Sequence, residues 1–297
     1  MPTPSFLERI AAWPWAEGVT VLFGFAWGAM LGSFINVVVH RLPRGESVVT
    51  ARSRCPRCGS AIRPQDNVPV LGWLWLRGRC RDCAAPIAAS YPLVEAACGG
   101  LVMLLAAAEL VGGGRWLPAF AAEPLQGIDR LLRGDWTLLV VLFVHSAAVL
   151  TVMAWSLLDG AGHRLPPAWV GATLVVAVTA VAAVPQAAPP EIWPGSATWP
   201  PAAGRLATAV VGVLAGWLAG RAGRGQGVRW GLPLVGSVLG WQGVTVVAVA
   251  AAVAGGLTRS GAAGRGFWIA GATTLWLAFS GPLTRGIMSL LVAEPAP

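Results

Sequence analysis

The chain of 297 residues is 56% hydrophobic and only 11% charged, and its mean hydropathy is +0.65. So little polar surface excludes a soluble globule and predicts a polytopic protein whose surface is largely covered by the lipid bilayer. The net charge of +8 comes from arginines scattered among apolar segments, without a basic face interleaved with aromatic residues. This pattern argues against a nucleic-acid partner.

Apolar runs that approach the length needed to cross the hydrocarbon, about 20 residues, recur along the chain. We expect about seven of them, near 18–39, 92–113, 136–158, 168–186, 204–222, 231–256 and 267–293. The last run is interrupted at Pro282 and can form two short pieces. The first run follows Glu8 and Arg9 and lacks a small-residue cleavage site, so it is expected to be a retained span. The predicted fold is an all-α polytopic membrane protein.

Arginines are distributed unevenly between the loops that join these runs. The loop from His40 to Ser90 carries nine and the short loop from Arg221 to Arg229 carries three, whereas the segments near 114–135 and 185–203 carry few for their length. The positive-inside rule therefore places the two arginine-rich loops in the cytoplasm and the N-terminus outside. Asp159, at the end of the third run, then lies at the cytoplasmic border.

The first hydrophilic loop contains the strongest chemical motif, "CPRCGSAIRPQDNVPVLGWLWLRGRCRDC". Two CxxC pairs, Cys55 with Cys58 and Cys80 with Cys83, are separated by 21 residues. This spacing predicts a small zinc ribbon between the first two spans, with two disulfides or four free thiols as the alternatives. A metal site closed by four cysteines has no open position for a substrate, so the zinc is expected to be structural.

Three elements together resemble one family closely. They are "GSFINVVVHRLPRGES" at Gly32–Ser47, the paired CxxC motifs, and "SYPLVEAACG" at Ser90–Gly99. In order and spacing they look like the amino-terminal half of prepilin peptidases, the leader peptidases and N-methyltransferases of type IV pilus and type II secretion systems. The resemblance implies an N-terminal region at 1–113, with the ribbon at about 40–90, and an intramembrane aspartic-protease-like helical domain at 114–297.

The same resemblance implies substrates, a cofactor and a location. Type IV prepilin-like or pseudopilin leader peptides would be cut after a glycine at the cytoplasmic face of the bacterial inner membrane. The new N-terminus would then be methylated with S-adenosylmethionine.

The carboxy-terminal half is also similar to the family, with one departure. In "LLDGAGHRLPP", Asp159 and Pro166 match the family's first catalytic aspartate and a proline seven residues later. The second aspartate follows a Gly-x-Gly motif and precedes a Gly-Trp pair in the family. Aligning "GQG" and "LGW" in "GRGQGVRWGLPLVGSVLGWQG" places Val228 at that position. After Asp159 the remaining acidic residues are Glu191 and Glu294, and neither lies where it can replace the missing carboxylate.

An aspartic protease needs two carboxylates that share a proton, so that one activates water while the other polarises the scissile carbonyl. A single aspartate cannot do both, and general acid or base assistance typically contributes about 10²- to 10⁴-fold in rate. We therefore expect a prepilin-peptidase-family protein with impaired proteolysis. The alternative is a non-proteolytic relative that acts as a prepilin-binding or secretion and pilus assembly component.

Two ionisable residues within the apolar runs are further candidates for a role. His145 is costly in hydrocarbon and is expected to be a hydrogen-bonded interhelical histidine, with a proton carrier as the alternative. It precedes Asp159 by fourteen residues, roughly 21 Å along a helix, which excludes direct contact. Glu95 matches a glutamate common in the family and is expected to be either catalytic support or an interfacial partner of an arginine. His163 and Arg164 are expected in a solvated loop.

Overall fold

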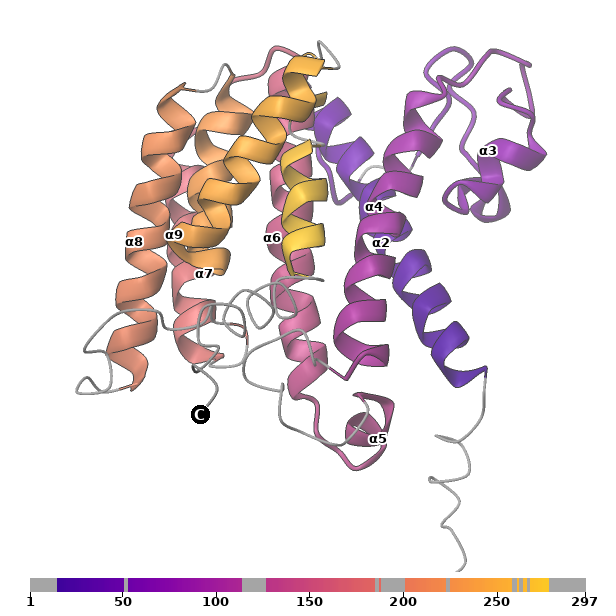
Figure 1. The fold of residues 1–297 in the computed structure, drawn as a ribbon. Coiled ribbons are helices and arrows are strands. Elements are labelled where there is room, and N and C mark those ends of the chain that lie inside the picture. Colours follow the sequence, from indigo (N-terminus) through magenta and orange to yellow (C-terminus); the bar gives the residue numbers. More distant parts are fainter. Residues whose placement is uncertain are drawn as a thin grey trace, which may run out of the picture. The chain divides into compact units, whose positions relative to one another are not determined.

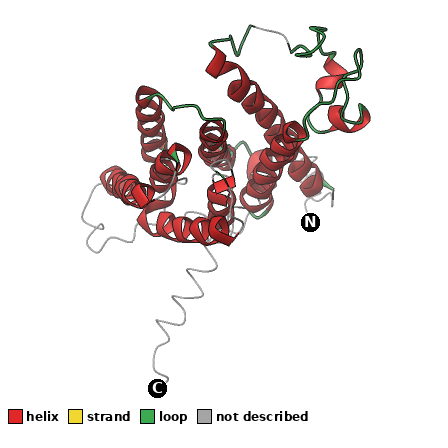
Figure 2. Cartoon of the chain, turned by 90° about the horizontal axis from the view of Figure 1, so that it is seen from above, coloured by secondary structure: helices red, strands yellow, loops and turns green. Residues whose placement is uncertain are grey.

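The structure is a computed structural model that describes residues 15–50, 53–113, 127–184, 187, 201–222, 225–257, 261, 264–265 and 268–277. Within these residues the regular elements are helices, joined by loops and turns (Figures 1 and 2). Extended pairing among the described residues is limited to two isolated bridges, Arg54 with Ala61 and Arg79 with Pro86. The all-α fold predicted from composition is confirmed.

The main helices follow the predicted apolar runs closely. Their bounds are α2 Ala16–Arg41, α3 Leu71–Trp75, α4 Ser90–Ala106, α5 Gly127–Leu132, α6 Thr137–Gly160, α7 Pro167–Ala183, α8 Pro201–Ala222 and α9 Gln226–Leu257. The short 3₁₀ helices Leu42–Arg44 and Pro64–Asn67 lie in the first hydrophilic loop, and a π-helical turn, Ala107–Val111, continues α4.

In the part of the chain that the structure describes, four helical segments are long and apolar enough to cross a membrane. They are Ala16–Arg44, Ser90–Val111, Thr137–Gly160 and Ala203–Arg221. The other three predicted runs coincide with shorter apolar helices, at Pro167–Ala183, Gly243–Ala254 within α9, and Trp268–Leu277. The part of the last run beyond 277, with its interruption at Pro282, lies outside the described residues.

The chain divides into two compact units. One comprises residues 22–103, and the other comprises 1–21 together with 104–297. In the first unit α2 packs against α4 through small residues. A Cβ added to Gly28 would lie 2.5 Å from the carbonyl oxygen of Cys98, and one added to Gly99 would lie 2.8 Å from the ring of Phe25. Such close backbone approach is how helices gain van der Waals contact where lipid offers no hydrophobic contrast.

Glycines serve the same purpose in the second unit. Gly216 and Gly220, four residues apart on α8, face the backbone of α9, and a Cβ on either would collide with the carbonyl of Leu232 or Arg229. Gly236 on α9 faces the carbonyl of Gly212 in the same way. The small-residue run "GWLAGRAG" therefore marks a helix-packing surface, as its composition predicts.

Candidate functional site

The hydrophilic loop between α2 and α4, residues 42–89, folds as two matching knuckles, and we call it the ribbon. In the first, Cys55 N–H donates to Ser60 O and the Gly59 N–H donates back to Cys55 O. The second repeats this pattern with Cys80, Ala85 and Ala84. Tight turns of this kind aim the two thiols of a CxxC pair toward one point.

The two knuckles bring all four predicted cysteines together. The sulfur atoms of Cys55, Cys58, Cys80 and Cys83 lie within 4.8 Å of one another, and all four thiols are free. Around a zinc ion with Zn–S bonds of about 2.3 Å, neighbouring sulfurs would be about 3.8 Å apart. The Cys55 and Cys83 sulfurs are separated by 3.8 Å. The cluster can therefore hold one four-coordinate metal ion, and the two-disulfide alternative is not seen.

Local hydrogen bonds favour the metal-binding thiolate form at two of the four cysteines. The side chain of Ser60, whose hydroxyl oxygen lies 3.4 Å from Cys58 Sγ, and then its backbone lower the pKa of the Cys58 thiol to about 6. The backbone N–H groups of Cys83 and Asp82 lower the pKa of Cys80. At Cys83 the hydrogen bond from the Ala85 backbone is outweighed by burial and by hydrogen bonds with the other three cysteines, which raise the pKa of its thiol to about 11. Thiolate is the ligand state of cysteine, so Cys58 and Cys80 are the two thiols that this arrangement prepares for a cation.

An ion pair holds the second knuckle against the segment that joins the two CxxC motifs. Arg81 donates from Nε to Asp66 Oδ2 at 2.7 Å and makes a second, shorter contact with Oδ1, so the pair is bidentate. Hydrogen bonds from Arg81 hold the pKa of Asp66 below its usual value. Trp73 adds an apolar anchor, donating its indole N–H to Ile87 O at 3.0 Å.

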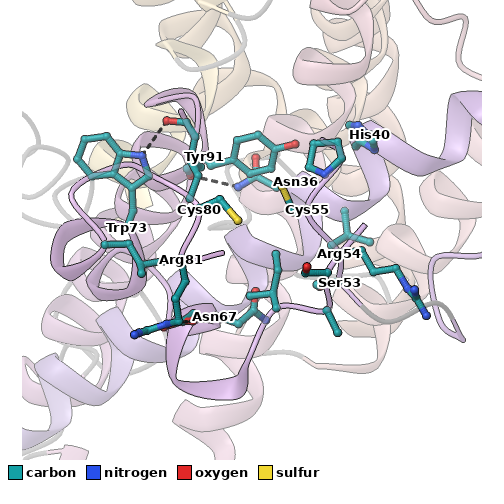
Figure 3. Close-up of a pocket in the computed structure, with 18 of the residues that line it drawn as sticks. Asn36, His40, Ser53, Arg54, Cys55, Asn67, Trp73, Cys80, Arg81 and Tyr91 are labelled. Carbon is teal, nitrogen blue, oxygen red and sulfur yellow. Dashed lines mark hydrogen bonds and ion pairs between the residues drawn. The ribbon is translucent and has the colours of Figure 1, made fainter. Parts of the chain in front are cut away.

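A cavity of about 1160 Å³ lies in this first unit, between the ribbon and the adjoining ends of α2 and α4. Figure 3 shows Asn36, His40 and Tyr91 gathered at one side of it, with Cys55 and Cys80 of the metal cluster nearby. Asn36 donates to the carbonyl of Tyr91 at 3.1 Å and so joins α2 to the start of α4. Arginines and carboxylates on the lining give the cavity a mixed polar character, with Arg41, Arg54, Arg81, Glu46, Asp66 and Glu95 among them.

Glu95 has a structural partner that the sequence did not indicate. Its carboxylate accepts a hydrogen bond of 2.7 Å from the backbone N–H of Val70. Val70 has φ 62° and ψ −54°, and the Leu71 N–H donates to Pro69 O across it at 2.6 Å. This is a γ-turn with positive φ, a strained conformation for a β-branched residue. Glu95 therefore holds a strained turn of the ribbon against α4.

Asp159 lies in the last turn of α6. The helix ends there because Gly162, at φ 80°, turns the chain left-handed, and the N–H groups of Ala161, Gly162 and His163 bond back to the final carbonyls. Pro166 and Pro167 then begin α7. His163 is half-buried and Arg164 is exposed, so the loop is solvated largely as predicted.

The segment that we predicted from the sequence to align with the family's second motif lies beside Asp159. Gly225, at φ 99°, is so close that a Cβ there would collide with Asp159 Oδ2, a buried atom without a described hydrogen-bond partner. A Cβ on Gly227 would come within 2.8 Å of Ser156 Cα, and Gln226 accepts a hydrogen bond of 3.1 Å from Leu165 N–H. Val228, one residue further, is buried in the first turn of α9.

His145 is the hydrogen-bonded interhelical histidine expected from the sequence. Its Nδ1 lies 2.6 Å from Glu109 Oε1, and its Nε2 lies 3.5 Å from the carbonyl of Ala187. Both side chains are 1% exposed. Sequence analysis missed Glu109, which lies on the π-helical turn after α4, although an acidic residue inside a predicted span is itself a signal.

Comparison with known proteins extends across most of the chain. Residues 26–109 match the family model for the Bacterial Peptidase A24 N-terminal domain. A prepilin leader peptidase/N-methyltransferase of Burkholderia pseudomallei is 31% identical over 289 residues, covering 84% of this chain and 78% of the relative. The protein of the same name from Klebsiella pneumoniae is 33% identical over 245 residues, covering 74% and 88%.

A third relative has a higher sequence identity over a shorter alignment. The prepilin leader peptidase/N-methyltransferase of Myxococcus xanthus is 53% identical over 74 residues, which cover 25% of this chain and 22% of the relative. No solved structure matches the chain. The two long alignments show that the similarity extends well beyond the part covered by the family model.

Proposed function

This chain belongs to the prepilin leader peptidase/N-methyltransferase family, and from that premise we propose that it binds prepilin-like or pseudopilin leader peptides but cleaves them poorly or not at all. The observation that carries the proposal is Val228. An isopropyl group can neither hold nor transfer the proton that a pair of catalytic carboxylates shares. Asp159 alone then lacks its partner, because no other acidic residue follows it among the described residues.

The cavity beside the ribbon suits the second activity named for the relatives. Its volume of about 1160 Å³ is large enough for a nucleoside-sized ligand. Tyr91 offers an aromatic face, Asn36 offers an amide, and Arg54 and Glu46 offer charges for an amino-acid end. When bound there, S-adenosylmethionine would supply a methyl group. The residues of this chain would orient the donor and the peptide N-terminus at the ribbon side of the membrane.

A structural zinc ion fits the four cysteines, because four thiols would close the site and their sulfur atoms lie within 4.8 Å of one another. Elemental analysis of protein purified without added metal should find one zinc per chain. Cys80→Ser should lose it, whereas Cys98→Ser, which changes a cysteine outside the cluster, should keep it. A metal-free chain with two disulfides between the pairs would overturn this assignment.

The arginine distribution supports a location in the bacterial inner membrane with the ribbon in the cytoplasm and the N-terminus outside. A reporter joined after Cys83 should then be cytoplasmic, and one placed near Ala188 should be external. The reverse pattern would overturn the orientation and with it the cytoplasmic position of Asp159.

Leader cleavage and methyl transfer are separable in a single assay. Purified protein is incubated, in the presence of S-adenosylmethionine, with a prepilin and with the same pilin already lacking its leader, and the two products are scored by mass spectrometry. We expect little cleavage of the first substrate and methylation of the second. Asp159→Asn serves as the control, since it should leave methylation unchanged. Rapid leader cleavage by the unmodified chain would contradict the proposal.

Absence of both products, with retained prepilin binding, would favour a second function. The chain would then act as a prepilin-binding or secretion and pilus assembly component. This alternative rests on the same observation, the missing carboxylate, combined with an intact ribbon and cavity.

A further inference from the structure

The short helix α3 exposes large apolar side chains although it belongs to the polar ribbon. Leu71, Leu74 and Trp75 are 52%, 55% and 51% exposed. We call these three residues the α3 patch. A contiguous apolar patch on an otherwise polar subdomain marks an interaction surface.

The position of α3 along α4 is fixed by the bond between Val70 and Glu95. Val70 immediately precedes α3, and Glu95 lies five residues inside α4, about 7.5 Å from its start at about 1.5 Å per residue. Figure 1 shows α3 at the level of the first turns of α4. Since α4 belongs to the candidate span Ser90–Val111, α3 lies beside the ribbon end of this span.

Both ends of the ribbon are joined to candidate spans. The ribbon follows Ala16–Arg44 and leads directly into Ser90–Val111. The Glu95 carboxylate on α4 binds the strained γ-turn at Val70, which immediately precedes α3. Contacts within its own unit therefore keep the patch at the ribbon end of these spans.

The charges around α3 favour anionic lipid. Arg77 and Arg79 follow α3 directly and are exposed. Asp66 and Asp82, two of the three acidic residues in the ribbon, are paired with Arg81 and Arg63. Tryptophan and leucine beside exposed arginines are typical of segments that lie in the headgroup region of anionic membranes.

We propose that the α3 patch inserts into the headgroup region of anionic phospholipids on the ribbon's side of the bilayer, with Arg77 and Arg79 binding lipid phosphates. The patch then acts as a second membrane anchor for the ribbon, between the two flanking spans. It keeps the cavity at a fixed level relative to the membrane surface. This inference is independent of leader cleavage and methyl transfer.

A photocrosslinking experiment on the full chain tests the proposal. Trp75, or Arg57 in the first knuckle as the control, is replaced by a benzophenone amino acid, and the protein is placed in nanodiscs of phosphatidylcholine with or without an equal share of phosphatidylglycerol. After irradiation, lipid adducts at each position are measured by mass spectrometry. We expect roughly tenfold more adduct at position 75 than at 57, with a further increase in phosphatidylglycerol.

A second measurement keeps the test independent of the probe. Phosphatidylglycerol should raise the unfolding temperature of the wild-type chain, and Leu74→Ser with Trp75→Ser should remove most of that rise without changing metal content. Equal lipid adducts at positions 75 and 57 would overturn the proposal. So would crosslinking of position 75 to a polypeptide in native membranes without lipid adducts in nanodiscs, which would make the patch a protein interface.

Discussion

Ala84 and Gly59 occupy equivalent positions in the two knuckles but differ in strain. Both are left-handed, at φ 55° and φ 75°, and both follow the second cysteine of a CxxC pair. Glycine adopts this left-handed conformation without steric cost, whereas for other residues the free-energy cost is about 1–2 kcal/mol. Ala84→Gly should therefore raise the stability of the second knuckle by about 1 kcal/mol. Slower amide hydrogen exchange at Cys80 would report the gain.

The matched control is the opposite change in the first knuckle. A Cβ on Gly59 would meet no atom within 4 Å, so Gly59→Ala tests backbone strain without a steric clash. It should lower stability by about 1 kcal/mol and speed exchange at Cys55. A loss of stability in Ala84→Gly would show that the side chain of Ala84 contributes more than its strained backbone costs.

Gly225 combines strain with crowding, and the two effects can be separated. Gly225 and Gly162 both have positive φ, but a Cβ at Gly162 would meet nothing within 4 Å, whereas one at Gly225 would collide with Asp159. Gly225→Ala should therefore destabilise the second unit by about 1–3 kcal/mol more than Gly162→Ala does. Thermal unfolding in detergent measures both variants. Equal losses would mean that α9 can move away from α6 at no cost.

At the level of elements, the sequence predicted those features that spacing alone determines. The two CxxC pairs specify their own ligand set, and the apolar runs specify their helices, so the metal cluster and the long spans were found. The strained turn at Val70 was not, because a β-branched residue has no propensity for positive φ. Its bond to Glu95 depends on how the ribbon folds back on α4, which local patterns do not encode.

The partner of His145 was missed for a similar reason. Glu109 lies 36 residues earlier, on a helix whose last turn widens to π geometry. The predicted apolar run 92–113 indicates that Glu109 lies inside a span. It does not indicate which neighbouring helix the Glu109 side chain faces. Helix packing decides that, and the π-helical turn shifts the helical register by about one residue, as π-bulges do.

The pair of Glu109 and His145 makes a prediction about helix association. Its members are both fully buried, so removing one leaves the other uncompensated. His145→Leu should lower the free energy of unfolding by about 3–5 kcal/mol. The double change with Glu109→Leu should recover most of this loss, since two apolar side chains need no partner. Thermal unfolding of the two single variants and the double variant completes the cycle, and strictly additive losses would contradict direct coupling.

At the scale of the whole molecule, the features of the two proposed activities fall in different compact units. The ribbon, its cysteines and the cavity belong to residues 22–103, whereas Asp159 and Val228 belong to the other unit. Each unit has its own packing, so loss of a carboxylate in one need not disturb the other. Under the proposed function, this separation would let the chain lose proteolysis and keep the ribbon.

Restoring the missing carboxylate tests that view most directly. Val228 lies in the first turn of α9. The nearby residues Gly225 and Gly227 lie close to Asp159 and Ser156, respectively. Val228→Asp should therefore bring a second carboxylate near Asp159 and produce measurable leader cleavage of a prepilin, where the wild type shows little or none. The gain should be modest, because a dyad misplaced by about 1 Å can lose about 10²-fold in rate.

Two controls decide whether such cleavage comes from a carboxylate pair. Val228→Asn introduces a side chain with the shape of aspartate but without its charge, and should give no gain in cleavage. Adding Asp159→Asn to Val228→Asp should abolish any cleavage that the single change produces. Both variants are compared with the wild type by mass spectrometry of the released leader. Strong cleavage by the unmodified chain that survives Asp159→Asn would show that this protein cuts its substrate with other residues, because neither aspartate position would then take part in the chemistry.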